Sequence, residues 1–517
     1  MSTEEKQPEN AAAEGQNAGR GGIAILFAKV FFILTGLVQQ ALLSRVIGQD
    51  GYGALSRVLA AANIPNNVVV SGSIQAMSRT VSQSGKDDQA AFRAAMRLHV
   101  PLALFLGGAF AMAAPFYASF QGTREITLPL VVMAVVLTIY SVYAPMVGAI
   151  NGRRKFLQQA TLDITAATLR TVGLAGAGYV FLRRGLDGTL GATSGAAVAI
   201  SCVLPLALMF SQALRRPRAG STYTFDSRAY LVALLPLALI QLGTNVLMQV
   251  DIMLLGSFLS KASETSGVSN PGKAANEWVG VYRSCQLFAF LPYQLLVSIT
   301  QVLFPMVAKA HANKDAAGVR AYVERGARIG VIAGGLMVGV IVAIPGPVIG
   351  ILYPAEMAAR GAATLRILAC GQGLFALMGI AMTVLASLGR ERLGAFISAG
   401  AILVSMVALY TFARPQPFGE AQLIGTAIGT SIALAVAFVA AAYAVRRLAG
   451  SFIPWLTAAR VAFAVGLLVA VGDRIPHGGK ILTIATAAGL GVLYLLALVL
   501  TRELTREDAK LLRTLRK

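Results

Sequence analysis

Two stretches decide the fold: MQVDIMLLGSFLS at residues 248–260 and EWVGVYRSCQLFAFLPYQLLVSITQVLFPMVAKA at residues 277–310. Each lies in an apolar segment long enough to cross a bilayer, and the two place Asp251 and Arg283 within such segments. A charge inside a membrane span costs roughly 3 kcal/mol on insertion scales, so it usually faces water or protein and marks a transport path. The alternative is that each side chain extends to the membrane surface along its flexible stem.

The composition sets the class of protein. Of the 517 residues 56% are apolar and 13% are charged, and the mean hydropathy is +0.68. These values predict an all-α polytopic membrane protein. The formal net charge is +21, which basic membrane loops explain better than nucleic acid, so no nucleic-acid partner is expected. The cysteines lie in apolar segments and indicate no disulfide framework.

We expect about 14 transmembrane helices, because 14 segments approach or exceed the ~20 apolar residues that span a bilayer. Their predicted limits are 22–47, 56–81, 92–117, 126–150, 156–182, 188–214, 229–258, 278–308, 328–353, 361–388, 393–413, 421–445, 453–472 and 480–501. The second is poor by hydropathy alone. Lys and Arg concentrate in the even-numbered connections and the C-terminal tail, which predicts that both termini are cytoplasmic.

An internal repeat divides these spans. A shift of 227 positions superposes Pro65 on Pro292, Asp88 on Asp315 and Arg93 on Arg320 without a gap. Slightly different shifts match Gly152 and Arg153 with Gly389 and Arg390, and the pair Gly191 and Gly195 with Gly425 and Gly429. Spans 1–6 are therefore repeated by spans 7–12, an arrangement typical of alternating-access carriers. The glycine pairs predict close helix packing, and the two prolines predict bent helices.

The predicted organisation follows from the spans and the repeat. It comprises a disordered cytoplasmic tail (1–20), an N-terminal lobe of six helices (21–214), a basic cytoplasmic linker (215–228), a C-terminal lobe of six helices (229–447), two extra helices (448–501) and a basic cytoplasmic tail (502–517).

Polar residues gather in the first two spans of each lobe. We expect these spans to line a central cavity dominated by Lys and Arg, which suits an anionic cargo bearing phosphate or pyrophosphate. The candidate binding residues are Lys29, Arg45, Arg57, Asn63, Asn67, Gln249, Arg283 and Gln286. For the isolated cations, anchoring at the membrane surface remains the alternative.

Two carboxylates are candidates for ion coupling. Asp251 is the better one, because a carboxylate facing a cavity can exchange a proton or bind Na⁺; the alternative is that it pairs with Arg283. Asp163 lies seven residues from Arg170 on one helix face, so a polar contact within the lobe is its alternative role. No catalytic, metal-binding or nucleotide-binding motif is present. We expect no cofactor beyond a coupling H⁺ or Na⁺.

Several stretches resemble a known family. They are LLSRVIGQDGYGALSRV (42–58), AINGRRKF (149–156), LRILACGQGLFALMGIAMTVLASLGRERLGAF (365–396) and the two opening stretches. Together they are similar to the polysaccharide-transporter branch, the Wzx-type flippases, of the multidrug/oligosaccharidyl-lipid/polysaccharide (MOP) exporter superfamily. The resemblance implies a bacterial inner-membrane protein that moves an undecaprenyl-pyrophosphate-linked oligosaccharide to the periplasmic leaflet. Polysaccharide polymerase and glycosyltransferases are the protein partners that this role implies.

Three other functions stay open. The segment LPYQLLVSITQVLFP (291–305) also resembles the lipid II flippases of the same superfamily. That likeness implies pyrophosphate-binding roles for the cations Lys29, Arg57 and Arg283. A cation-coupled multidrug exporter is disfavoured because the chain has 14 predicted spans where such an exporter has twelve, and because the predicted cavity carries cations in place of carboxylates. A membrane polysaccharide polymerase or ligase would be expected to have a larger outward loop.

Overall fold

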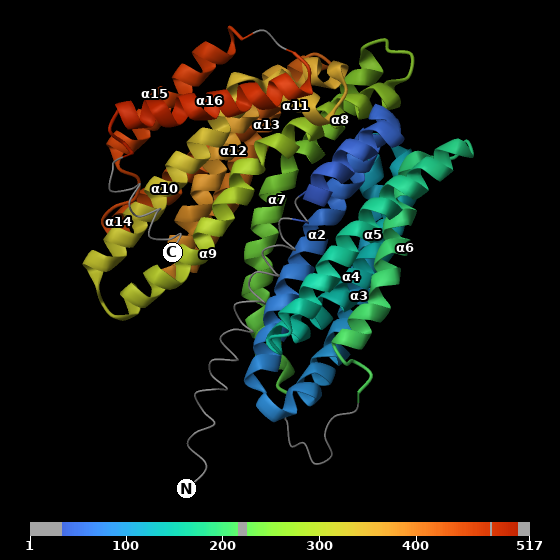
Figure 1. Ribbon diagram of the computed structural model, residues 1–517. Coiled ribbons are helices and arrows are strands. Elements are labelled where there is room, and N and C mark those ends of the chain that lie inside the picture. The colour runs from blue at the N-terminus through green and yellow to red at the C-terminus, as the bar shows by residue number, and fades with distance from the viewer. Residues whose placement is uncertain (1–30, 32–33, 216–224, 476–477, 505–517) are drawn as a thin grey trace. The chain divides into compact units, whose positions relative to one another are not determined.

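The computed structural model describes residues 31, 34–215, 225–475 and 478–504 (Figure 1). These residues form α-helices and two short 3-10 helices, without a strand among them. Residues 34–46 are helical. They are followed, before residue 227, by α2 (Gly48–Gln83), α3 (Asp88–Phe120), α4 (Thr127–Gly152), α5 (Phe156–Arg183) and α6 (Gly188–Phe210), with the 3-10 helices η1 (Gly85–Asp87) and η2 (Arg124–Ile126). The later ones are α7 (Ser227–Thr265), α8 (Pro271–Ala289), α9 (Leu291–Ala312), α10 (Ala316–Ala343), α11 (Pro345–Leu352), α12 (Ala355–Ser387), α13 (Glu391–Phe412), α14 (Glu420–Ala449), α15 (Trp455–Gly472) and α16 (Lys480–Leu500).

The helices confirm the prediction of an all-α polytopic membrane protein. In the described part of the chain, 11 helical segments are long and apolar enough to cross a membrane. They correspond to the predicted spans 3, 4 and 6–14. The first predicted span is only partly described; Lys29, the tail 1–20 and most of the linker 215–228 lie outside the described residues.

Helices α2 and α5, the second and fifth predicted spans, are missing from that set because they are too polar. Helix α2 carries Asn63, Asn66 and Asn67 within a few residues, and α5 carries Asp163 and Arg170. Such helices are tolerated at membrane depth where protein or water covers their polar side.

The helices form two compact units that divide between Gln249 and Val250, within α7. In unit 1, α4 packs on α2, α3 and α6, and α5 packs on α6. In unit 2, α12 packs on α8, α9, α10 and α14, and α13 packs on α14. The two sets match when α3, α4, α5 and α6 are paired with α10, α12, α13 and α14. The packing therefore follows the order of the sequence repeat.

The glycine pairs that the repeat matches have the packing role that the sequence predicts. A Cβ atom on Gly191 would lie 2.7 Å from the carbonyl oxygen of Ala177 on α5. A Cβ atom on Gly425 would collide with the carbonyl oxygen of Phe412 on α13. Because α5 and α6 approach so closely, and α13 and α14 likewise, only glycine fits without displacing backbone.

The two equivalent prolines have different effects. Pro65 lies inside the continuous helix α2. At its counterpart Pro292 the helix is interrupted: α8 ends at Ala289 and α9 begins at Leu291, with Pro292 in the first turn of α9. Proline fits the first turn of a helix, where its missing N–H would have no helical partner. Unit 2 thus uses two helices where unit 1 uses one.

The last two helices attach to unit 2 through a buried carboxylate. Helix α15 packs on α10, and α16 packs on α15, α10 and α11. Just after α16, the carboxylate of Glu503 accepts hydrogen bonds from Arg328 Nε on α10 at 2.8 Å, and from Thr457 Oγ1 at 2.7 Å and Arg460 Nη1 at 2.9 Å on α15. Burial alone would raise the pKa of Glu503, but the bonds from the two arginines and the threonine outweigh it, so its pKa is lowered.

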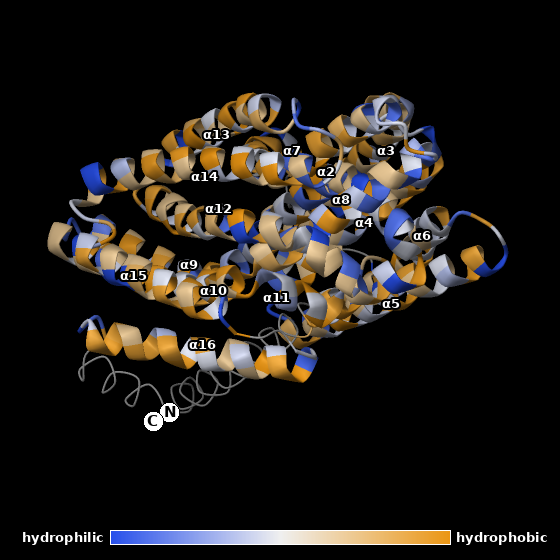
Figure 2. Cartoon of the chain, turned by 90° about the horizontal axis from the view of Figure 1, so that it is seen from above, coloured by the Kyte–Doolittle hydropathy of each residue, from blue (hydrophilic) through white to orange (hydrophobic). Residues whose placement is uncertain are grey.

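Large apolar side chains remain exposed along the helices. Examples are Phe116 on α3 at 77%, Phe396 on α13 at 75% and Ile481 on α16 at 87% exposure. Figure 2 shows that apolar residues run along the helices while hydrophilic residues gather mostly at their ends and turns. A soluble protein seldom exposes so much apolar surface, so lipid is the natural neighbour of these faces.

Candidate functional site

The site begins with Asp251, which α7 places in the interior of unit 2. Its carboxylate is 1% exposed. Tyr282 Oη on α8 donates to it at 2.7 Å, and Gln286 Nε2, one helical turn further along α8, donates to both oxygens at 3.0 Å. The backbone N–H of Ile252 also donates to it at 2.7 Å. A buried carboxylate needs such donors, because desolvation without them would be very costly.

Gln286 connects this carboxylate to Arg283. Its amide oxygen accepts a hydrogen bond from Arg283 Nη1 at 3.0 Å while its amide nitrogen faces Asp251. Residues three apart on a helix lie on one face, which explains why Arg283 and Gln286 meet. In the described part of the chain, Asp251 and Arg283 form no direct ion pair. The expected pairing is therefore indirect, through the amide of Gln286.

Through Gln286, a change of charge at Asp251 can affect the hydrogen bond of Arg283. Arg283 is half-buried, and one of its nitrogens is used by Gln286, so the rest of the guanidinium can meet an anion. Asp251 is sealed in this conformation, so exchange of an ion at its carboxylate requires movement. The residue that the sequence reasoning missed is Tyr282. Its position four residues before Gln286 was a usable signal, since both then lie on one face of α8.

Arg57 has a different environment from the one expected of a cavity cation. Its side chain is 0% exposed, and Nη1 donates to the carbonyl of Gln121 at 2.9 Å. Tyr117 Oη donates to the carbonyl of Arg57 at 3.2 Å. Gln121 caps the C-terminal end of α3, where carbonyls lack helical partners and favour a cation. In this conformation Arg57 therefore joins α2 to α3, and its role as a cavity cation stays a prediction.

The remaining candidates in unit 1 are dispersed. Arg45 is exposed, Asn63 is half-buried, and Asn67 Nδ2 donates to Asn245 Oδ1 at 2.8 Å, which links α2 to the first part of α7. Gln249 is buried, and its amide oxygen finds no hydrogen-bond partner among the described residues.

Asp163 is half-buried on α5. Its helix neighbour Arg170 donates through Nε to Gln39 Oε1 at 3.2 Å. Coupling by Asp163 stays a prediction. Within the described ranges, the structure contains no cluster of three or more His, Cys, Asp or Glu side chains that could hold a metal ion.

Comparisons with known proteins place this geometry in context. A family model described as "Polysaccharide biosynthesis protein" matches residues 18–311, more than half of the chain. No curated protein shows significant sequence similarity to the chain.

Solved structures share the fold. The lipid II flippase MurJ in an inward closed conformation superposes with a TM-score of 0.71 at 12% identity, covering 93% of this chain and 99% of that one. An inward-facing multidrug resistance MATE family transporter of the MOP superfamily gives 0.63 at 14% identity, covering 81% and 95%. A MOP superfamily transporter from Pyrococcus furiosus gives 0.57 at 15% identity, covering 84% and 96%. At these identities the likeness extends to the fold of transporters and flippases.

Proposed function

Because the chain belongs to the polysaccharide biosynthesis protein family, we propose that it is a flippase for an undecaprenyl-pyrophosphate-linked oligosaccharide. It would carry this lipid from the cytoplasmic to the periplasmic leaflet of a bacterial inner membrane by alternating access, with both of its termini in the cytoplasm. The family, the fold shared with a lipid II flippase and with MOP transporters, and the polar site on α7 and α8 support this proposal.

The observation that carries the proposal is Arg283. It is a half-buried arginine in a membrane helix, held by a single neutral amide at 3.0 Å. The guanidinium fork matches phosphate oxygens in two-point contacts, and Gln286 occupies one of its nitrogens. Arg283 is therefore our first candidate for the group that holds the pyrophosphate, and the same role for the buried Arg57 stays an untested prediction.

Asp251 would couple an ion to this contact through Gln286. While Asp251 is a carboxylate, the Gln286 amide must present its NH₂ to Asp251 and its oxygen to Arg283. A protonated Asp251 becomes a donor, so the amide can turn and present NH₂ to Arg283, which would break their bond. Proton uptake would thus release Arg283 for the cargo. Na⁺ beside Asp251 is the alternative coupling ion.

Replacing Arg283 tests the proposal. We expect Arg283→Ala to abolish surface glycan while the protein still inserts in normal amount. Arg283→Lys should restore only a small part, since an ammonium keeps the charge without the fork. Arg414→Ala is the matched control, because Arg414 is an exposed arginine of unit 2 that stacks over Tyr410 at 5.5 Å. Full surface glycan in Arg283→Ala cells would remove the pyrophosphate role.

The leaflet that holds the cargo separates this function from its alternatives. In a deletion strain, a flippase defect leaves the lipid-linked sugar in the cytoplasmic leaflet. A polymerase or ligase defect leaves it periplasmic, but short or unattached. A lipid II flippase would instead block peptidoglycan synthesis, and a multidrug exporter would lower resistance to cationic dyes with glycans intact.

A further inference from the structure

A cluster of polar side chains closes one end of unit 1. Arg153, between α4 and α5, donates through Nε to Asp88 Oδ2 at 2.6 Å and through Nη2 to Gln89 Oε1 at 2.6 Å, both at the start of α3. Its Nη1 donates to the carbonyl of Ser211 at the end of α6. We call Asp88, Gln89, Arg93 and Arg153 the Arg153 cluster.

The rest of the Arg153 cluster also binds the end of α6. Gln89 Nε2 donates to the carbonyls of Gln212 at 2.8 Å and Arg215 at 3.1 Å, and Arg93 Nη2 donates to that of Leu214 at 3.2 Å. These carbonyls lie just beyond the last turn of α6, where backbone acceptors have no helical partner. The cluster therefore ties α3, the α4–α5 connection and α6 together.

In unit 2, the residues equivalent to the Arg153 cluster line a pocket. Asp315, Ala316, Arg320 and Arg390 are the counterparts of Asp88, Gln89, Arg93 and Arg153 under the shifts of the repeat, and all four line a pocket of about 850 Å³. The bonds of the cluster are not repeated there. Gln89 is replaced by Ala316, the carboxylate of Asp315 accepts from the Gly318 N–H at 2.8 Å, and Arg390 forms no ion pair within the described residues.

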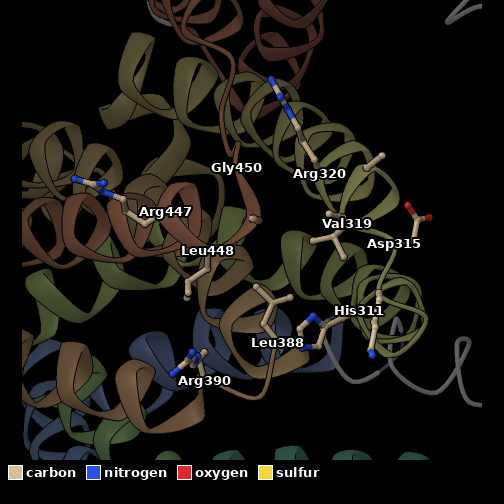
Figure 3. Close-up of a pocket in the computed structure, with 13 residues that line it drawn as sticks. His311, Asp315, Val319, Arg320, Leu388, Arg390, Arg447, Leu448 and Gly450 are labelled. Atoms are coloured by element: carbon tan, nitrogen blue, oxygen red, sulfur yellow. The ribbon is translucent and has the colours of Figure 1, made fainter.

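The pocket combines positive charge with an apolar centre (Figure 3). Its basic lining residues are His311, Lys314, Arg320, Arg390 and Arg447, against the single carboxylate of Asp315 among the residues that line it. Figure 3 shows Val319, Leu388 and Leu448 near the middle, with the arginines around them. Arg447 is partly occupied, since its Nε donates to Tyr443 Oη at 2.9 Å. Arg320 and Arg390 are exposed.

We propose that this pocket binds the phosphate group of an anionic membrane phospholipid. Arg320 and Arg390 supply charge-assisted donors for the phosphate oxygens, and Val319, Leu388 and Leu448 contact the apolar part next to the headgroup. The pocket lies where α10 begins and where α12 and α14 end. Ends of membrane-spanning helices lie at the level of the headgroups. The lipid phosphate would then join these three elements, as Arg153 joins their counterparts.

Thermal unfolding of the purified full-length chain in mild detergent tests the site. Short-chain phosphatidylglycerol, short-chain phosphatidylcholine and inorganic phosphate are added in separate titrations. We expect phosphatidylglycerol alone to raise the unfolding midpoint with saturation, because a ligand that binds the folded state stabilises it by mass action.

Variants assign the effect to the pocket. The pair Arg320→Gln and Arg390→Gln should weaken the apparent affinity for phosphatidylglycerol about tenfold or more, since two charge-assisted bonds are lost. The matched control is the pair Arg392→Gln and Arg446→Gln, which removes the same charge from neighbouring exposed positions outside the pocket lining. It should change the affinity less than about twofold.

A second variant covers the case in which the arginine pair fails to fold. Ala316→Gln restores the side chain of unit 1 at an exposed position, and it should also weaken lipid binding by filling the pocket. Three results would overturn the proposal: no saturable stabilisation, equal weakening by the control pair, or stabilisation by inorganic phosphate with the same dependence on Arg320 and Arg390. The last would assign the pocket to a soluble phosphate compound. None of these readouts depends on transport, so the test stands apart from the proposed function.

Discussion

At one end of each unit three elements meet, and the contacts between them differ. The elements are α3, the α4–α5 connection and α6 in unit 1, and the start of α10 with the ends of α12 and α14 in unit 2. In unit 1 the Arg153 cluster fills the junction with side chains, and Arg153 is only 9% exposed. In unit 2 the equivalent helix ends surround a pocket, and Arg390 is exposed. Among the four residues of the cluster and their counterparts, one residue type differs: Gln89 in one unit is Ala316 in the other. A duplicated fold can thus keep its packing while one copy has an open pocket where the other has an internal contact.

The largest effect that would sharpen this comparison is expected at Arg153. Arg153→Ala removes three hydrogen bonds and leaves the carboxylate of Asp88 and the carbonyl of Ser211 without the donors that Arg153 supplies. We expect a loss of about 2–3 kcal/mol in unfolding free energy, since breaking a largely buried pair is costly. Arg390→Ala should cost less than about 0.5 kcal/mol in lipid-free detergent. Equal losses in chemical denaturation would show that the two junctions are equivalent.

Gly191 and Gly425 test a feature that the two units should share, the close packing of neighbouring helices. Gly191→Ala and Gly425→Ala each push a Cβ atom against a backbone carbonyl of the neighbouring helix. Both should cost about 1–3 kcal/mol through overpacking. Gly108→Ala is the control, because nothing lies within 4 Å of its added Cβ, and alanine favours a helix. Denaturation midpoints of the three variants measure this. A tolerated change in one unit alone would contradict the shared packing.

Glu503 tests a contact that only the C-terminal part of the chain provides. Glu503→Gln keeps the shape but removes the charge that faces Arg328 and Arg460, which are each 31% exposed. We expect a loss of about 1–2 kcal/mol near neutral pH. The measurement is the free energy of unfolding of both proteins.

The same pair of proteins gives a pH dependence. The pKa of Glu503 is lowered from its ordinary value of 4.5, so the folded state binds its proton less readily than the unfolded state. Its stabilisation is therefore complete above about pH 4.5 and disappears as the pH falls through the lower folded pKa. The difference in unfolding free energy between wild type and Glu503→Gln should therefore shrink as the pH is lowered from about 5. A constant difference over that interval would contradict the ion-pair role.

The smallest expected effect comes from exchanging the one differing side chain. Gln89→Ala should cost about 1 kcal/mol, because it removes bonds to two carbonyls at the end of α6 and to Arg153. Ala316→Gln should stabilise unit 2 by at most a similar amount. The two unfolding free energies measure this. Destabilisation by both changes would show that unit 2 has no room for the side chain.

The sequence predicted the fold well where apolar length decides the outcome. Eleven predicted spans recur as apolar helices, and the glycines of the repeat lie at close helix contacts. It was less informative where a contact depends on exact geometry. The break at Pro292 but not at Pro65 could not be read from two prolines in the same register.

For the site, residue type indicated Asp251, Arg283 and Gln286 but not how they connect. An arginine in an apolar segment looks the same whether it faces water, as half-buried Arg283 can, or a helix end, as Arg57 does. In the sequence, Arg153 stood out only as the repeat match of Arg390 and as part of the AINGRRKF stretch. Its contact with Asp88 could not be read there, because Asp88 lies 65 residues earlier in the chain.

The position of Glu503 has a practical consequence for anyone who shortens or tags this protein. Its side chain and its backbone carbonyl both contact Arg328, and it lies only three residues beyond the end of α16. A deletion that removes it would take away the hydrogen bonds that join the end of α16 to α10 and α15, even though every membrane helix is still encoded. Fusion partners should therefore be joined after residue 504.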